Sequence, residues 1–181
     1  MSMISWDDFE HIHVIKKLRQ ILSGWWNVDI VFTDERGQLK GLESSRGSYA
    51  NPATQFLLQK EVVRNSLSEL VGKSFEEMRT ASSEFVLRKW DSSGFDVGVF
   101  PIVIENDFMG FVVATGFFKD PAEGSRSLEI RDRLAAFGAP QELIEKALSK
   151  IKYIDGSDRE HFCELISLVA QEIVTLHLEV S

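Results

Sequence analysis

Apolar residues occur at nearly every position in the middle of the chain, and this pattern predicts strands. Residues 95–104 and 108–118 form two apolar runs, and Glu105-Asn106-Asp107 between them predicts a tight hairpin. Residues 84–90 form a preceding strand, followed by a turn at residues 91–94. Both alternating sets of the two later strands are apolar. We therefore expect them to be covered on both faces, or covered on one face while walling a cavity on the other.

Helical spacing precedes this region. An apolar stripe over residues 9–22 predicts an N-terminal helix that ends at Ser23-Gly24. Two strands follow, at residues 28–32 and 39–42, and the polar residues 43–52 predict a loop.

The segment before residue 84 is predicted to be helical but broken. A helix is expected over residues 53–65. Ser66 with Glu69, and Ser74 with Glu77, have the spacing of capping boxes. They predict short helices or turns rather than one long helix.

Helical spacing returns after residue 118. Asp120-Pro121 has the pattern of a helix start, and further helices are predicted over residues 141–149 and 157–177. The order of elements predicts an α+β fold, with a five-stranded antiparallel sheet of the PAS or GAF kind flanked by helices, including N- and C-terminal helices. The 181 residues fit a single domain. Within it we assign 1–24 to the N-terminal helix, 25–154 to the sheet-and-helix core, and 155–181 to the C-terminal helix.

Charge and composition narrow the class of protein. A net charge of −8 argues against direct nucleic-acid binding, which needs clustered Lys and Arg. The run from 108 to 118 is about half of a membrane span. The first residues do not form a signal peptide, and the single cysteine, Cys163, allows no intramolecular disulfide. These features predict a soluble, cytoplasmic protein.

Motifs for catalysis are not found in the sequence. His161 and Cys163 are two residues apart on a predicted helix, as are His11 and His13, so neither pair readily shares a metal ion. The sequence has no G-x-S-x-G elbow and no glycine-rich phosphate loop. Cys163 lies in an apolar helical run, which predicts a buried thiol. We therefore expect no enzymatic activity, metal site or cofactor.

Polar residues within the apolar strands are the candidates for ligand binding. Arg88 and Trp90 share one face of their strand, where they would hold a carboxylate or a planar ring. The alternative is an edge strand whose charges discourage sheet-to-sheet association. Glycines in and beside the strands, such as Gly98 and Gly116, indicate either bulges or room for a ligand. The candidate ligand-binding residues are Arg88, Trp90, Phe95, Phe100, Thr115, Tyr49 and Asn51, the last two as lid residues.

Three segments resemble the PocR-type sensory domain, a relative of PAS and GAF domains found in bacterial transcription regulators. They are VDIVFTDERGQL, FVLRKWDSSGFDVGVFPIVIENDFMGFVVATGFF, and a helix ending AAFGAP that leads to ELIEKALSKIKYID. The resemblance spans residues 22–176 and implies a sensor joined to an output module. Many members of that family carry cysteines, and a histidine just before the glycine-containing turn. Here Arg88-Lys89-Trp90 occupies that place and no cysteine lies near Tyr49, so cysteine-dependent ligand contacts do not carry over.

Two functions remain open. In the first, a small molecule or partner occupies the space between sheet and helices and biases the terminal helices, which relay the signal to a transcription-regulating output module. In the second, the chain is a ligand-free interaction or dimerisation module whose cavity is filled by Phe95, Phe100, Phe111 and Phe117. A homodimer is expected through an apolar stripe on the last helix, unless that stripe is buried within one subunit. The stripe consists of Phe162, Ile166, Val169, Ile173 and Leu176.

Overall fold

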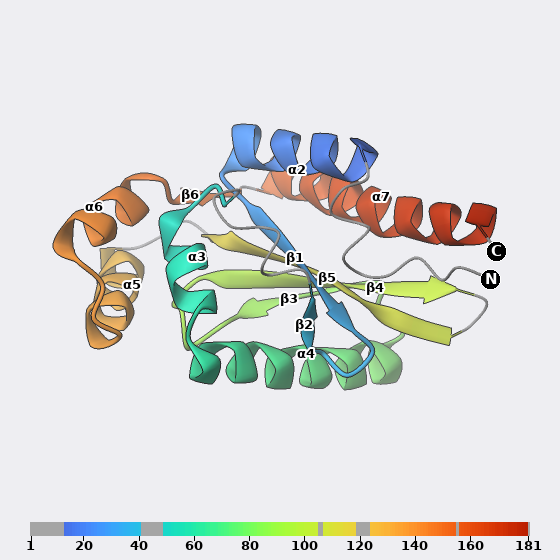
Figure 1. The fold of residues 1–181 in the computed structure, drawn as a ribbon, viewed down its shortest axis with the longest axis horizontal. Coiled ribbons are helices and arrows are strands. Elements are labelled where there is room, and N and C mark those ends of the chain that lie inside the picture. The colour runs from blue at the N-terminus through green and yellow to red at the C-terminus, as the bar shows by residue number, and fades with distance from the viewer. Residues whose placement is uncertain (1–12, 41–48, 105–106, 119–123, 155, 181) are drawn as a thin grey trace.

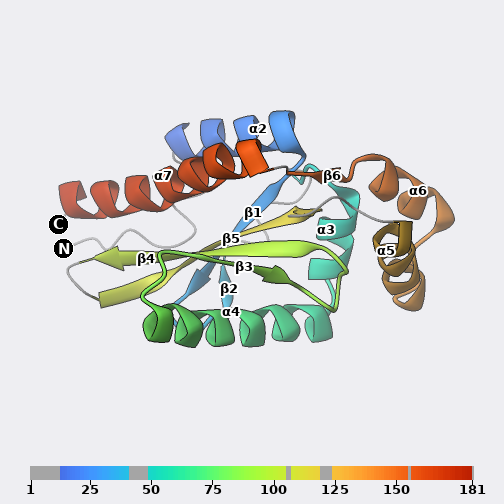
Figure 2. The ribbon, with the colours of Figure 1, turned by 180° about the vertical axis from the view of Figure 1, so that it is seen from behind.

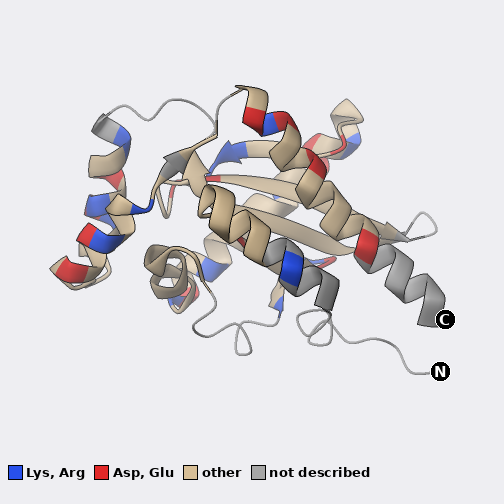
Figure 3. Ribbon diagram, turned by 90° about the horizontal axis from the view of Figure 1, so that it is seen from above, with Lys and Arg blue, Asp and Glu red and all other residues tan. Residues whose placement is uncertain are grey.

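One antiparallel sheet carries helices on both faces and at one end. The structure, a computed structural model, describes residues 13–40, 49–104, 107–118, 124–154 and 156–180. In chain order the elements are α2 (His13–Trp26), β1 (Asp29–Asp34), β2 (Leu39–Lys40), α3 (Pro52–Leu58), α4 (Glu61–Ala81), β3 (Val86–Lys89), β4 (Asp96–Ile104), β5 (Asp107–Phe118), α5 (Gly124–Ala136), α6 (Gln141–Ser149), β6 (Lys152–Tyr153) and α7 (Gly156–Val180). Helices α2 and α7 cover one face of the sheet, α4 covers the other, and α5 and α6 lie at one end (Figures 1 and 2). Figure 3 looks down on α2 and α7, which lie side by side.

The sheet has the strand order β2-β1-β5-β4-β3, and each neighbouring pair is antiparallel. The short strand β6 runs parallel to the end of β5, where Phe117 and Phe118 lie opposite Lys152 and Tyr153. The predicted α+β fold with a five-stranded antiparallel sheet is confirmed. Several predicted positions lie outside the described residues: the hairpin residues Glu105 and Asn106, the helix start at Asp120-Pro121, and residues 41–48.

The central strands β4 and β5 are buried on both faces, as their sequence predicts. Alternate side chains point to opposite faces of a strand, so each strand contributes to two cores. The α4-side core includes Val97, Val99, Phe111 and Val113, packed against Val63, Leu67 and Val71 of α4. The α7-side core includes Phe100, Ile102, Val112 and Ala114, packed against Phe162, Ile166 and Val169 of α7. The second face of the sheet is thus covered by the terminal helices.

Helix α4 corrects the prediction of short helices before residue 84. It runs without interruption over 21 residues, and both presumed capping serines lie inside it. Ser66 and Ser74 each donate a hydroxyl hydrogen bond back to a carbonyl one turn earlier, at 2.8 Å, to Val63 and Leu70 respectively. The stripe of α4 residues buried at intervals of three and four decides the structure, because it packs along the sheet. The true break lies between α3 and α4, so the helix predicted over residues 53–65 is two helices.

Helix α2 extends past Ser23-Gly24, where the sequence predicts its end. It ends instead at Trp26, because Asn27 adopts a left-handed conformation with φ of 52°. The backbone N–H of Asn27 donates to the carbonyl of Ser23 at 3.1 Å, the bond that closes such a helix end. Both Trp25 and Trp26 are therefore carried on the last turn of α2.

Candidate functional site

Four buried polar residues gather where β1 and β5 pass beneath the start of α3. Asp29, Asn51, Thr54 and Thr115 are each no more than 5% exposed. We call them the β1/β5 polar cluster. Asp29 lies directly opposite Thr115 in the sheet, and Asn51 is the residue that precedes α3. A buried polar group is destabilising unless it is hydrogen-bonded, so each side chain needs a partner.

Asp29 and Asn51 have such partners. The Asp29 carboxylate accepts hydrogen bonds from the backbone N–H groups of Ala50 and Asn51, the latter at 3.1 Å. The Asn51 side chain accepts from the N–H of Ala53 at 2.9 Å, which caps α3, and donates to the carbonyl of Ala147 in α6 at 3.3 Å. These bonds fasten the start of α3 to β1 on one side and to α6 on the other.

The side chains of Thr54 and Thr115 lack such partners among the described residues. Their hydroxyl oxygens are buried and have no hydrogen-bond partner among the described residues. The Thr54 hydroxyl lies 3.8 Å from the place a β-carbon would occupy on Gly116, the residue next to Thr115. Two unsatisfied hydroxyls therefore lie in the same buried neighbourhood, beside a carboxylate that is already engaged. Unpaired buried hydroxyls of this kind are candidates for hydrogen bonds to a small polar molecule.

A glycine bulge shapes this neighbourhood. Gly116 has a φ of 97°, and the pairing of β5 with β4 shifts register between Asp96 and Val97, opposite it. A β-carbon on Gly116 would lie 3.2 Å from the carbonyl oxygen of Asn27, just after α2. Gly116 therefore agrees with the first interpretation of the strand glycines, because it marks a bulge and permits a close approach of the chain's own backbone.

Arg88 and Trp90 lie away from the cluster, beside α4. Trp90 is buried and its indole N–H donates to the Ser66 hydroxyl at 3.0 Å. The guanidinium of Arg88, on the edge strand β3, pairs with Glu77 of α4 at 3.3 Å. Both line a cavity of about 180 Å³, smaller than the roughly 300–1,000 Å³ typical of small-molecule sites. These contacts agree with the edge-strand interpretation of Arg88.

The remaining predicted ligand residues are divided between the two cores. Phe95 packs in the α4-side core, 6.2 Å from the ring of Phe118, whereas Phe100 packs in the α7-side core against Phe85 at 5.2 Å. Since these positions are five residues apart, their side chains lie on opposite faces and do not line one pocket. Tyr49 is half-buried against the α4-side core, next to Ala50. Of the predicted set, the structure therefore brings Thr115 and Asn51 together, with Tyr49 close by in the chain.

Three residues of the predicted dimer stripe are packed within the chain. Phe162, Ile166 and Val169 are each 0% exposed in the α7-side core. Ile173 and Leu176 belong to α7, but their side chains lie outside the described set. The packing occupies three of the five stripe residues because α7 lies directly on β4 and β5. The homodimer itself stays a prediction.

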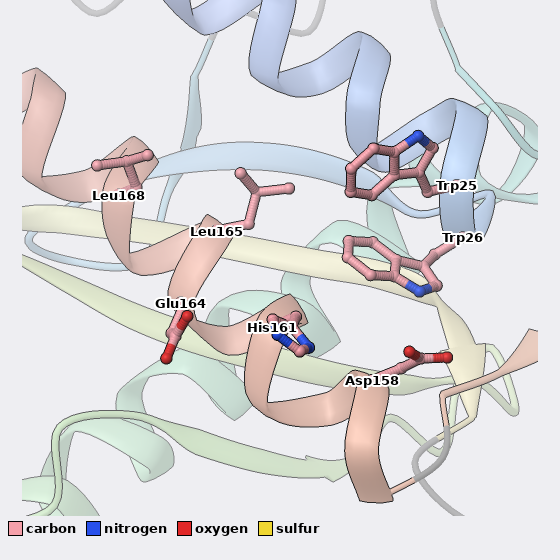
Figure 4. A pocket seen from close by; sticks show the side chains of 7 residues that line it. All are labelled: Trp25, Trp26, Asp158, His161, Glu164, Leu165 and Leu168. Atoms are coloured by element: carbon pink, nitrogen blue, oxygen red, sulfur yellow. The ribbon is translucent and has the colours of Figure 1, made fainter.

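A groove with different properties lies between α2 and α7. It has a volume of about 780 Å³. Its described lining residues, shown in Figure 4, are Trp25, Trp26, Asp158, His161, Glu164, Leu165 and Leu168. The ring of Trp26 contacts those of Trp25 and Phe162 edge-on, with centroids 5.6 and 5.9 Å away. We call this surface the α2/α7 groove.

Cys163 lies near a second groove, on the other flank of α7. The side chain is 7% exposed, and burial raises the pKa of its thiol to about 11 despite the nearby charge of Arg159. The predicted burial of this cysteine is confirmed, and its thiol is protonated at neutral pH. In the described part of the chain, no group of three potential metal ligands comes together. No described helix has the length and apolar character needed to cross a bilayer.

Several residues of these sites were not found by sequence reasoning. Asp29 carried a signal, as an acid between Val28 and Ile30 in an otherwise apolar strand. Trp25 and Trp26 follow the helix end that the sequence predicts at Ser23-Gly24, so the pattern does not place them on the helix. Thr54 carries no signal in the sequence, because its role depends on where α3 lies.

Residues 11–178, nearly the whole chain, match the family model described as the sensory domain found in PocR. No curated protein and no solved structure matches the chain. The family match confirms the resemblance found in the sequence and supports a sensing role. A sensory family also suggests a function other than catalysis.

Proposed function

Because this chain belongs to the family of sensory domains found in PocR, we propose that it is a cytoplasmic sensor of a small molecule. The ligand binds at the β1/β5 polar cluster, and the terminal helices relay its presence to an output module that regulates transcription. The observation that carries this proposal is the pair of buried, unpaired hydroxyls of Thr54 and Thr115. Leaving a buried hydroxyl unpaired costs about 1–3 kcal/mol, and a ligand that bonds both hydroxyls recovers that energy.

The chemistry of the cluster favours a small neutral ligand. Each threonine hydroxyl is able to donate one hydrogen bond and to accept others, so hydroxyl and carbonyl groups match it. The Asp29 carboxylate, held by two backbone N–H groups, gives the neighbourhood negative character that disfavours an anion. No metal or cofactor is needed for such binding.

The position of the cluster supports the relay. Asp29 follows the end of α2 by three residues, and Gly116 closely approaches the Asn27 carbonyl. The Asn27 side chain also donates to the carbonyl of Lys150, whose own ammonium group donates to Ala50 at 3.3 Å. A ligand that moves the start of α3 therefore acts on the end of α2 through a short chain of contacts. Such a ligand shifts the terminal helices only by as much as it prefers one arrangement over the other.

Native mass spectrometry of the protein as purified from cells tests ligand binding. We expect a reproducible extra mass per chain relative to the denatured mass, which is lost in Thr115→Val and in Thr54→Val. Thr80→Val, an exposed threonine on α4, is the matched control and should keep the extra mass. If extra mass is missing from the wild type after incubation with a cell metabolite extract, the sensor proposal is wrong for this site.

The second candidate is a ligand-free interaction module. The observation in its favour is the filled interior: Phe111 and Phe117 are each 1% exposed and lie in different cores. In that case neither the wild type nor the two threonine variants would carry extra mass relative to the denatured protein. Binding of a protein partner would then depend on the surface of the terminal helices.

A further inference from the structure

The α2/α7 groove has the composition of a docking surface. The two helices that form it, α2 and α7, cover the face of the sheet opposite α4 (Figures 1 and 2), over the α7-side core. Trp25 is 65% exposed and Leu168 is 48% exposed, although both are large and apolar. Trp26 and Leu165 lie deeper, half-buried between them. Exposed apolar residues gathered on one surface mark interaction sites, and tryptophan is among the strongest anchors at interfaces.

The carboxylates that line this groove are not accompanied by basic lining residues. Asp158 and Glu164 are exposed acids, and none of the described lining residues is Lys or Arg. Asp158, His161 and Glu164 are three residues apart, and Leu165 and Leu168 continue the same face of α7. Figure 3 shows the acidic positions spaced along α7 beside α2. Apolar anchors flanked by acids are complementary to a segment that carries both apolar and basic side chains.

We infer that the α2/α7 groove binds an amphipathic helix of a partner protein, one that presents Lys or Arg beside apolar side chains. The groove runs between two helices, and a third helix packs naturally into such a space. The apolar face of the partner covers Trp25 and Leu168, and its basic residues pair with Asp158 and Glu164. This inference does not depend on a ligand at the β1/β5 polar cluster.

Two other occupants fit the surface less well. A small molecule is usually buried over 70–90% of its surface, whereas one wall of this groove is a tryptophan that is 65% exposed. A second copy of the chain, related by a two-fold axis, would bring the same patch against itself. That arrangement sets Asp158 and Glu164 of one copy near those of the other, and like charges in close contact disfavour it.

Fluorescence anisotropy with a synthetic probe tests the inference. The probe is a fluorescein-labelled peptide of about five helical turns, with Leu along one face and Lys elsewhere. A matched peptide replaces every Lys by Glu. We expect the Leu/Lys peptide to bind and the Leu/Glu peptide not to bind. Trp25→Ala and Glu164→Lys should each weaken binding about tenfold or more.

Matched substitutions elsewhere separate groove binding from general attraction to an acidic protein. Val62→Ala removes an apolar residue on α4 that is 63% exposed, and Glu69→Lys reverses an exposed acid on the same helix. Both should leave the affinity within about twofold, since rim and distant residues contribute little. Val62 and Glu69 lie on α4, which covers the opposite face of the sheet from the groove. Circular dichroism will establish that all four variants are folded.

Three results would overturn the inference. The first is failure of the Leu/Lys peptide to bind, and the second is equal weakening by Glu69→Lys and Glu164→Lys. The third is a dimer in sedimentation velocity that Trp25→Ala abolishes, which assigns the groove to a second copy of the chain. Because none of these measurements uses the buried threonines, failure here is distinguishable from failure of the proposed sensor function.

Discussion

At the scale of single residues, the main contrast is between paired and unpaired buried hydroxyls. Thr33 and Thr115 are both at most 1% exposed and lie on adjacent strands. The Thr33 hydroxyl donates to the Asp34 carbonyl at 3.1 Å, whereas the Thr115 hydroxyl has no partner among the described residues. The protein therefore retains, at Thr115, a polar atom that is unfavourable for the stability of the fold. Residues of this kind are candidates for function, since packing alone would favour valine.

This contrast gives a prediction that needs no ligand. Thr115→Val should leave the free energy of unfolding of ligand-free protein unchanged or raise it by about 1 kcal/mol, because it removes an unsatisfied hydroxyl. Thr33→Val should lower it by about 1 kcal/mol, because it removes a bonded one. Urea unfolding followed by tryptophan fluorescence measures both. An equal loss in the two variants would mean that the Thr115 hydroxyl is bonded after all.

Individual residues also show where sequence reasoning stops. Thr115 and Asn51 could be selected because a polar residue in an apolar or turn-rich segment is visible in the sequence. Arg88 and Trp90 were equally visible, yet Trp90 is held by Ser66 and Arg88 by Glu77. Both of those partners belong to α4, which the sequence did not reveal as one helix. Side-chain contacts of this kind depend on the tertiary arrangement and are not written in the local pattern.

At the scale of elements, the five antiparallel strands were predictable, whereas the short strand β6 and the helix breaks were not. The alternation in β4 and β5 correctly assigns side chains such as Val99 and Phe100 to opposite faces, because the period of a strand is fixed by its geometry. Helix breaks depend on weaker local preferences. A serine followed three residues later by a glutamate resembles a capping box, but it also occurs in the middle of a helix, as at Ser66 and Ser74.

The two serines of α4 give a prediction at this scale. Ser74→Ala should change the free energy of unfolding by less than about 0.5 kcal/mol, since alanine favours a helix interior and the residue caps nothing. Ser66→Ala should lower it by about 1–3 kcal/mol, because the buried indole N–H of Trp90 loses its acceptor. Thermal unfolding by circular dichroism measures both changes. A loss above about 1 kcal/mol in Ser74→Ala would restore the interpretation of Ser74 as a cap.

At the scale of the whole molecule, the two faces of the sheet carry different candidate sites. The face toward α3 and α4 contains the β1/β5 polar cluster, and the face toward α2 and α7 carries the groove. The contact between Gly116 and Asn27 connects them, because it joins the cluster to the end of α2. The sequence correctly predicted a five-stranded antiparallel sheet with flanking helices. It did not predict this connection, which depends on a backbone approach between distant residues.

Gly116→Ala tests the connection. Alanine at this position would have to adopt a φ of 97°, and its β-carbon would lie 3.2 Å from the Asn27 carbonyl oxygen. We therefore expect the free energy of unfolding to fall by about 1–3 kcal/mol. Amide hydrogen exchange should become faster in the last turn of α2 as well as around Thr115. Gly72→Ala is the matched control: its β-carbon meets nothing within 4 Å in α4, and it should stabilise the protein by up to about 1 kcal/mol. If exchange becomes faster in β5 but not in α2, the cluster and α2 are not coupled.

The bulge at Gly116 also determines which residues of β5 face each side of the sheet. Before it, odd-numbered residues such as Val113 face α4; after it, odd-numbered Phe117 faces α7 and even-numbered Phe118 faces α4. The strand therefore consists of two segments of opposite parity joined by one extra residue. If β5 followed regular alternation through Gly116, without the bulge, Phe117 would face α4 and Phe118 would face α7, and the anchor for β6 would change with them. The bulge is therefore what places these two phenylalanines on their present faces.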